Sequence, residues 1–178
     1  SDFVEQTCSD NFAQFCKNIA VKCAVTEIDP YRIEVARKCG LTVWNPNELD
    51  IPTMISEYTY GRKADIVIEA TGNGFEQALK CVTPGGKVLP FGMDSSITAK
   101  VVPNEITRWA TKIIGLYLGQ NTMVPSIRIF RENRIDMSNF FTKVISLEDG
   151  ITAFEDLGLD LKTLERIPKK AMKIVMKP

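Results

Sequence analysis

The chain has 178 residues, which predicts one domain or one domain with an appendage, and its 22 basic and 22 acidic side chains give a formal net charge of zero. Without a positive surplus there is no electrostatic indication of a nucleic-acid partner or of an anionic membrane surface. The chain contains no histidine, which excludes a hydrolytic triad or a histidine-ligated metal centre within this polypeptide. Chemistry is therefore expected from a bound cofactor or from residues supplied elsewhere, and the partner is expected to be a small molecule.

Five cysteines are scattered along the chain without a C-x-x-C pair, and their odd number argues against a disulfide framework. Reduced thiols are typical of the cytoplasm, so a cytoplasmic location is predicted. The first residues are polar and acidic, and no apolar run approaches the length of a membrane span. We therefore expect neither a signal peptide nor a membrane-spanning segment.

The most informative stretch is an apolar strand over residues 22–27 that ends on Glu27 and turns at once into a helix. Asp29 is expected to cap that helix, Pro30 to be its first residue and Gly40 to stop it. Its inward face is expected to carry Ile33, Ala36 and Cys39. In nucleotide-binding α/β domains, a carboxylate at the end of the second strand accepts hydrogen bonds from both hydroxyls of an adenosine ribose and repels a 2′-phosphate. Glu27 occupies that position, although an acidic strand end can also serve only solubility or capping.

Alternating strand and helix patterns continue along the rest of the chain. Residues 64–70 are β-branched and continuously apolar at their centre, which predicts a central strand covered by helices on both faces. The following Thr71-Gly72-Asn73-Gly74 predicts a loop where the backbone passes close to another group. The remaining predicted elements are a strand over 41–44, helices over 52–60 and 75–81, a tight turn at 84–86 and a strand over 87–92.

Short connections between these elements predict a parallel sheet with right-handed crossovers. The expected fold class is therefore α/β, with a doubly wound parallel sheet. Ligands of such sheets lie across the carboxyl ends of the strands. Glu27, residues 70–73 and residues 91–93 are expected to share that edge.

Several pieces of the sequence, taken in order, resemble one family of enzymes. They are Glu27-Ile28-Asp29-Pro30-Tyr31-Arg32 with Ala36-Arg37-Lys38-Cys39-Gly40, then Asp65-Ile66-Val67-Ile68-Glu69-Ala70-Thr71-Gly72, Pro84-Gly85-Gly86-Lys87-Val88, residues 113–119, residues 141–154 and residues 173–176. These pieces resemble the cofactor-binding half of medium-chain dehydrogenases, and are closest to the zinc-dependent polyol and threonine dehydrogenases. The resemblance extends from residue 12 to residue 178.

This resemblance implies a Rossmann-like dinucleotide-binding domain over residues 1–140 and a return segment over 141–178 that packs on a catalytic domain in relatives. It implies an oxidoreductase that transfers a hydride between a secondary alcohol and NAD, while a zinc ion in the catalytic domain polarises the oxygen. Glu27 would bind the adenosine ribose, Arg32 would stack on the adenine or remain a solvated helix arginine, and Gly92 would let the nicotinamide approach the sheet edge. The residues expected to contact NAD are Glu27, Asp29, Arg32, Ala70, Thr71, Gly72, Phe91, Gly92 and Met93.

Two features depart from the family's pattern. A catalytic domain with zinc ligands has no counterpart here, so the chain alone is expected to bind no zinc and to show no dehydrogenase activity. The family's G-x-G-x-x-G phosphate loop corresponds to residues 5–11, which contain no glycine, and residues 2–4 are too short for the central first strand. Strain and repulsion there would lower dinucleotide affinity by about two orders of magnitude. Either the amino end is trimmed and rearranged, or the domain is degenerate.

Two other function classes stay open. A non-catalytic domain would keep the sheet as an assembly or interaction module, and a methyl transferase that uses S-adenosylmethionine also places an acid at the end of its second strand. The apolar strand over 112–119 is expected at a sheet edge, where it would join a second copy into a dimer unless a helix after Met123 covers it. Residues 162–173 are expected to form a solvated connection, and Cys39 and Cys81 to be buried apolar groups.

Overall fold

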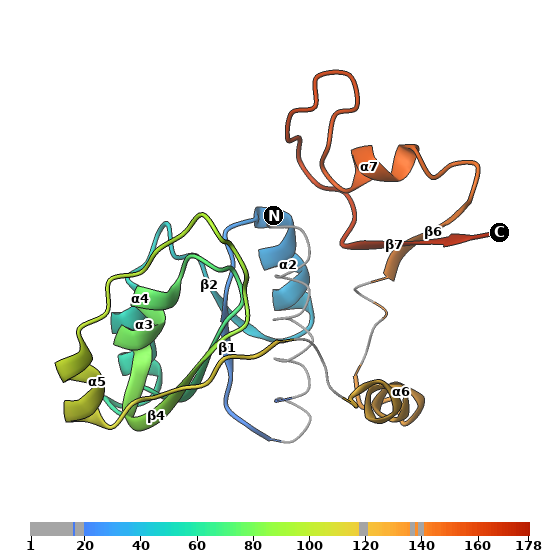
Figure 1. The fold of residues 1–178 in the computed structure, drawn as a ribbon. Coiled ribbons are helices and arrows are strands. Elements are labelled where there is room, and N and C mark those ends of the chain that lie inside the picture. Colours follow the sequence, from blue (N-terminus) through green and yellow to red (C-terminus); the bar gives the residue numbers. More distant parts are fainter. Residues whose placement is uncertain (1–15, 17–19, 118–120, 136–137, 139–140) are drawn as a thin grey trace. The chain divides into compact units, whose positions relative to one another are not determined.

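Figure 1 shows the fold in a computed structural model, which describes residues 16, 20–117, 121–135, 138 and 141–178. The strands are β1 (Ala24–Thr26), β2 (Thr42–Trp44), β3 (Ala64–Glu69), β4 (Val82–Pro90), β5 (Lys112–Ile113), β6 (Phe141–Ser146) and β7 (Lys173–Lys177). The helices are α2 (Pro30–Lys38), α3 (Ile51–Tyr58), α4 (Phe75–Cys81), α5 (Pro103–Trp109), α6 (Met123–Arg131) and α7 (Thr152–Asp156). The expected first strand (2–4), the phosphate loop (5–11) and the end of the strand predicted over 112–119 lie outside the described residues.

Every strand pair in the described part of the chain is parallel. The strands form one sheet of β1 and β2, one of β3, β4 and β5, and one of β6 and β7. The prediction was a single doubly wound sheet, whereas the described strands form three separate sheets. In a doubly wound sheet the first strand is central and joins the two halves. Residues 2–4, where that strand is expected, are not among those described.

The contacts divide the chain into two compact units. One contains Pro46–Arg128, and the other contains the described residues up to Asn45 together with Ile129–Pro178. The predicted boundary between a dinucleotide-binding domain over residues 1–140 and a return segment over residues 141–178 separates regions by their expected role. That boundary stays a prediction. No helix in the described ranges combines the length and the hydropathy needed to span a bilayer.

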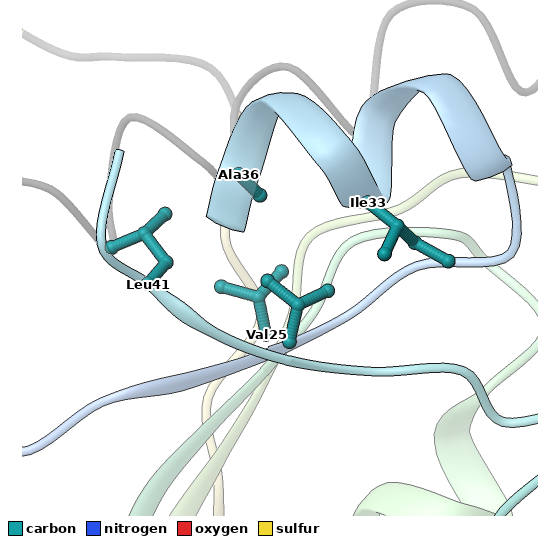
Figure 2. Packing of buried hydrophobic residues seen from close by; sticks show 5 residues of the cluster. Val25, Ile33, Ala36 and Leu41 are labelled. Atoms are coloured by element: carbon teal, nitrogen blue, oxygen red, sulfur yellow. The ribbon is translucent and has the colours of Figure 1, made fainter. Parts of the chain in front are cut away.

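β1, α2 and β2 enclose a small apolar core. Figure 2 shows Ile33 and Ala36 of α2 facing Val25 of β1, with Leu41 beside them, and Val43 of β2 belongs to the same buried cluster. Ile33 and Ala36 are three residues apart and therefore share one face of the helix. This is the inward face that the helical periodicity predicts.

The end of α2 follows the predicted pattern. Gly40 adopts φ +70° and its N–H donates to the Arg37 carbonyl at 2.8 Å, which closes the last turn in a backbone conformation that glycine favours. Another side of α2 carries Val35, which packs against Met172 in the segment before β7. β6 and β7 lie side by side at the carboxyl end of the chain (Figure 1), and β7 is the closing strand predicted over 173–176.

β3 and β4 carry the core of the unit that contains Pro46–Arg128. Val88 of β4 is fully buried and clusters with Ala78 of α4 and with Val82, and Val67 of β3 packs against them. The other face of β3 is open, because Ile66 is 53% exposed. The prediction that helices cover both faces of this strand is therefore wrong for the described residues, in which α4 covers one face and β3 pairs only with β4.

β5 lies at one edge of the three-stranded sheet, as the chain order predicts. Its pairing with β4 continues beyond Ile113, because Ile114 N–H donates to the Val88 carbonyl at 3.0 Å and Leu116 N–H to the Pro90 carbonyl at 3.2 Å. Residues 113–117 are exposed. The edge is therefore open in the described part of the chain, even though a helix, α6, does follow it.

Candidate functional site

Glu27 is the first residue after β1. Its backbone N–H donates to the Trp44 carbonyl at 3.0 Å, so the residue continues the pairing of β1 with β2. Its side chain is 3% exposed, and its Oε1 accepts the backbone N–H groups of Ile28 at 2.7 Å and Asp29 at 2.8 Å. The turn that follows the strand therefore holds the carboxylate where the sequence predicts it.

Arg32 lies in the first turn of α2, with its guanidinium near the same carboxylate. Its Nη1 is 3.8 Å from Oε2 of Glu27, and both side chains are buried. Of the two alternatives for Arg32, the solvated helix arginine is wrong, because the pair with Glu27 draws the side chain inward. Burial raises the pKa of Glu27 above its ordinary value, while the Asp29 N–H, the Arg32 charge and the Ile28 N–H act in the opposite direction.

The two carboxylate oxygens of Glu27 differ in the hydrogen bonds that they accept. Oε1 accepts two backbone N–H groups, which uses the two lone pairs of that oxygen. Oε2 faces Arg32 at 3.8 Å, which is longer than a hydrogen bond, so this contact leaves the acceptor capacity of the oxygen unused. Because only 3% of the side chain is exposed, a ribose reaches Oε2 only after neighbouring atoms move. Binding of a ribose at Glu27 therefore stays a prediction, and it would use this one oxygen.

Asp29 uses its carboxylate in two ways. Oδ1 accepts the backbone N–H of Arg32 at 3.1 Å and so caps α2, as predicted. Oδ2 lies 3.2 Å from Nζ of Lys169, and both side chains are partly buried. The prediction of a solvated connection is wrong for Lys169, because packing of Met172 on α2 brings this segment to the helix cap.

Glu69 ends β3 and is 7% exposed. Its Oε1 accepts the backbone N–H groups of Thr71 at 2.9 Å, Gly72 at 2.9 Å and Gly74 at 3.2 Å. The Thr71 hydroxyl lies 2.5 Å from the same oxygen, and Gly72 N–H also reaches Oε2 at 3.1 Å. The carboxylate therefore lies at the centre of the loop that precedes α4.

The segments that follow β3 and β4 pack closely against each other at Gly92. The Glu69 carbonyl accepts the N–H groups of Phe91 at 2.8 Å and Gly92 at 2.9 Å. A Cβ on Gly92 would lie 2.1 Å from the Gly72 nitrogen and 2.6 Å from the Thr71 carbonyl carbon. We expected the missing Cβ to make room for a nicotinamide ring, but the backbone of residues 70–72 fills that space.

The predicted cofactor-contacting residues fall into two groups. Glu27, Asp29 and Arg32 form one connected cluster in the unit that contains β1. Residues 70–72 and 91–93 lie together at the ends of β3 and β4, where Ala70 is buried and Met93 is exposed. Each group is thus brought together within its own unit.

Sequence reasoning missed two residues of these clusters. Glu69 carries the same signal as Glu27, an acidic residue at the end of a strand, and that signal was available. Lys169 pairs with Asp29 across a long stretch of sequence, and no local pattern links the two positions.

A metal site does not fit the part of the chain that the structure describes. No group of three or more histidine, cysteine, aspartate or glutamate side chains in the described ranges is arranged to hold a metal ion. A catalytic zinc needs three protein ligands and one open position. These residues therefore do not supply a zinc centre.

Parallel strands joined by helices, with an acidic residue after one strand and a glycine loop after another, define the class of Rossmann-like nucleotide-binding domains. The model of the zinc-binding dehydrogenase family matches residues 11–132, which is more than half of the chain. The chain therefore belongs to the zinc-binding dehydrogenase family, within the zinc-type medium-chain dehydrogenases, and corresponds to their cofactor-binding half. The predicted family and the predicted α/β, Rossmann-like fold class are confirmed, although the described strands pair in three sheets rather than in one.

The sorbitol dehydrogenase of Bacillus subtilis (strain 168) is 30% identical over 134 residues, which are 74% of this chain and 38% of that protein. The crystal structure of 2R,3R-butanediol dehydrogenase from Bacillus subtilis has a TM-score of 0.75 at 23% identity, covering 93% of this chain and 46% of that chain. A short chain alcohol dehydrogenase from E. coli CFT073, solved with NADH, has a TM-score of 0.75 at 19% identity, covering 93% and 48%. These two structures share the fold, and this chain spans less than half of each of the three proteins.

Proposed function

We propose that this chain is the NAD-binding part of an alcohol or polyol dehydrogenase, in which a hydride passes between a secondary alcohol and the nicotinamide. The observation that carries the proposal is the buried Glu27 carboxylate directly after β1, whose Oε1 accepts two backbone N–H groups and whose Oε2 faces Arg32 at 3.8 Å. NAD, when bound, supplies the hydride acceptor. The residues of this chain bind and orient it.

Glu27 also sets a preference for NAD over NADP. A 2′-phosphate would bring close to two negative charges against the Glu27 carboxylate. The nearby cations do not offset this repulsion, because Arg32 already faces Glu27 and Lys169 faces Asp29. Asp29 and Arg32 hold the turn and the carboxylate, and stacking of the adenine on Arg32 would require neighbouring atoms to move, because the arginine side chain is only 2% exposed.

The second group of residues lines the nicotinamide half of the cofactor in this proposal. These residues are Ala70, Thr71, Gly72, Phe91, Gly92 and Met93. Side-chain contact would come from Thr71 and from the exposed Met93, because the backbone of residues 70–72 fills the space beside Gly92. The loop conformation, rather than an open gap at Gly92, then shapes this end of the site.

The zinc and the alcohol would be held by residues outside this chain. The described residues do not fit a zinc ion, and the chain has no histidine. The chain alone is therefore expected to bind no stoichiometric zinc and to reduce no NAD with a polyol. Metal analysis of the purified chain and an absorbance assay for NADH formation test both points.

Calorimetric titration of the chain with NADH and with NADPH tests the ribose assignment. NADH should bind more tightly, and Glu27→Gln should weaken NADH binding and narrow the preference by about tenfold, since 1.4 kcal/mol of binding energy corresponds to that factor. Glu34→Gln is the matched control, because Glu34 is an exposed carboxylate on α2 that pairs with Lys38. Tighter binding of NADPH to the unmodified chain would contradict the assignment of Glu27.

A non-catalytic assembly module is the second candidate function, and the open apolar edge at residues 113–117 favours it. We propose that the strand over 112–119 joins a second copy of the chain into a dimer. Sedimentation equilibrium tests this: the chain should be a dimer, and Leu116→Lys should make it a monomer. Absence of NADH binding at millimolar concentration, with the dimer intact, would favour the module over the cofactor domain.

The methyl transferase alternative is tested by the same titration with S-adenosylhomocysteine in place of NADH. An acidic residue after β1 serves a ribose in both classes, so only the choice of ligand separates them. The cytoplasmic location stays a prediction from cysteine usage.

A further inference from the structure

The loop Thr71-Gly72-Asn73-Gly74 has the features of an anion-binding nest. Its residues are small or polar, Gly72 adopts φ +86°, and the N–H groups of three of its residues converge on one point. In such nests successive backbone N–H groups surround a phosphate or another anion. Here the point of convergence is already taken, because the three N–H groups bind Oε1 of Glu69.

Neutral donors alone surround the Glu69 carboxylate in the described structure. Its hydrogen bonds come from three backbone N–H groups and the Thr71 hydroxyl, and none of the described ion pairs includes it. Because Glu69 is only 7% exposed, water can replace these hydrogen-bond donors only if the loop opens. The anion that the nest requires is therefore supplied by the chain itself.

The loop is also held from its other side. Gly72 packs against the segment after β4, where a Cβ on Gly72 would lie 3.0 Å from the Asp94 nitrogen, and Gly92 touches the same loop. Without the carboxylate, the three N–H groups would lose their partner while this packing still limits where they can turn. They would then need another anion or water.

We propose that Glu69 is a positioning residue whose carboxylate occupies the amide nest of the 71–74 loop. These hydrogen bonds keep the loop in one conformation. Because its N–H groups are bound to Glu69, they do not bind a phosphate group of a ligand. The part of this inference that concerns NAD rests on the proposed function, while the part that concerns the loop does not.

Hydrogen exchange of the whole chain, read at the amides of Thr71, Gly72 and Gly74, tests the role of Glu69. In Glu69→Ala these amides should exchange at least about tenfold faster than in the unmodified chain, which corresponds to a loss of 1.4 kcal/mol of protection. Sodium formate should restore protection, because formate fits the vacated nest, whereas sodium chloride at equal ionic strength should not. Glu57→Gln, a neutralised exposed carboxylate on α3, should leave these amides unchanged.

Glu69→Gln keeps the test decisive if the alanine variant does not fold. Its carbonyl oxygen can still accept the loop N–H groups, so exchange should be intermediate. Formate should have no effect on it, because the side chain still fills the nest. Unchanged exchange in both variants would overturn the proposal, as would faster exchange that spreads equally to Val88 in β4 and that formate does not reverse.

NADH titration adds a readout that depends on the proposed function. NADH affinity should fall by about tenfold in Glu69→Ala and recover with formate, because a disordered loop must be ordered again on binding. If the unmodified chain binds no NADH, the proposed function fails, and the exchange experiment still decides the role of Glu69. If NADH binds equally to both chains while exchange differs, Glu69 holds the loop but does not position it for the cofactor, and that part of the proposal is overturned.

Discussion

Glu27 and Glu69 both stand at the carboxyl end of a parallel strand, and both are almost fully buried. Each accepts backbone N–H groups from the turn that follows it. The two residues differ at the second carboxylate oxygen. Oε2 of Glu27 faces the guanidinium of Arg32 at 3.8 Å, whereas Oε2 of Glu69 accepts the Gly72 N–H at 3.1 Å.

In the proposed function, this difference separates an acid that binds a ribose from an acid that holds a loop. A carboxylate offers a ligand only the acceptor capacity that its own chain has not used. The proposed function assigns Oε2 of Glu27 to a ribose hydroxyl, whereas both oxygens of Glu69 accept N–H groups of its own loop. The position at a strand end is the same for both residues, so the donors around each carboxylate, rather than topology, distinguish their roles.

The largest effect is expected at Gly92, where the loop held by Glu69 packs against the segment after β4. A Cβ at this position would lie 2.1 Å from the Gly72 nitrogen, so Gly92→Ala should lower the free energy of unfolding by about 4 kcal/mol or prevent folding. Gly115→Ala, with no atom within 4 Å of the new Cβ, should change it by less than about 0.5 kcal/mol. Urea denaturation measures both. A Gly92→Ala chain of unchanged stability would show that the two loops do not pack as described.

Removal of Arg32 should have the next largest effect, and it acts only on the Glu27 side of the comparison. Arg32→Met leaves a buried carboxylate without its cation and should destabilise the fold by about 3 kcal/mol at neutral pH. Arg37→Met, an exposed change on the same helix, is the control. The double variant Glu27→Gln/Arg32→Met should be more stable than Arg32→Met alone, because the unpaired charge is gone. Equal stability of these two variants in urea denaturation would contradict the buried pair.

Local features of the sequence predicted the elements around Glu27 well. The Asp29 cap, Pro30 at the start of the helix and Gly40 at its end depend on neighbouring residues alone, and the structure has all three. The face of α2 that carries Ile33 and Ala36 follows from helical periodicity and is buried as predicted. Short-range hydrogen bonding and the period of apolar residues were sufficient here.

Features that depend on distant partners could not be predicted in this way. The run of apolar residues in β3 indicated burial on both faces, but Ile66 is exposed because the second face needs a covering element that no local pattern specifies. The pair of Lys169 with Asp29 joins residues far apart in sequence. Glu69 was overlooked although its sequence pattern was visible. An acidic residue that ends a strand is equally compatible with capping a helix, binding a ligand or holding a loop.

A smaller effect is expected from the pH dependence of Glu27. Burial raises its pKa above the ordinary value of 4.5, so the folded chain holds this proton more tightly than the unfolded chain does. The contribution of Glu27 to the free energy of unfolding is therefore fully present below pH 4.5 and falls as the pH rises through the raised pKa. Glu27→Gln removes this dependence on pH. As the pH rises, the free energy of unfolding of the variant should therefore increase relative to that of the unmodified chain. Urea denaturation across that range, with Glu57→Gln as control, should show the shift for Glu27 alone.

The smallest effect is expected for the ion pair between Lys169 and Asp29, which supports the turn beside Glu27 and has no counterpart at Glu69. Both side chains are only partly buried, so Lys169→Met should lower the free energy of unfolding by about 1 kcal/mol or less. At about 1 M salt, where charges are screened beyond about 3 Å, the difference should shrink. Lys170→Met, an exposed neighbouring change, should have no measurable effect in the same urea titration. Equal losses in the two variants, or a loss at Lys169 that salt does not reduce, would mean that packing of the lysine stem, rather than its charge, ties this segment to the cap of α2.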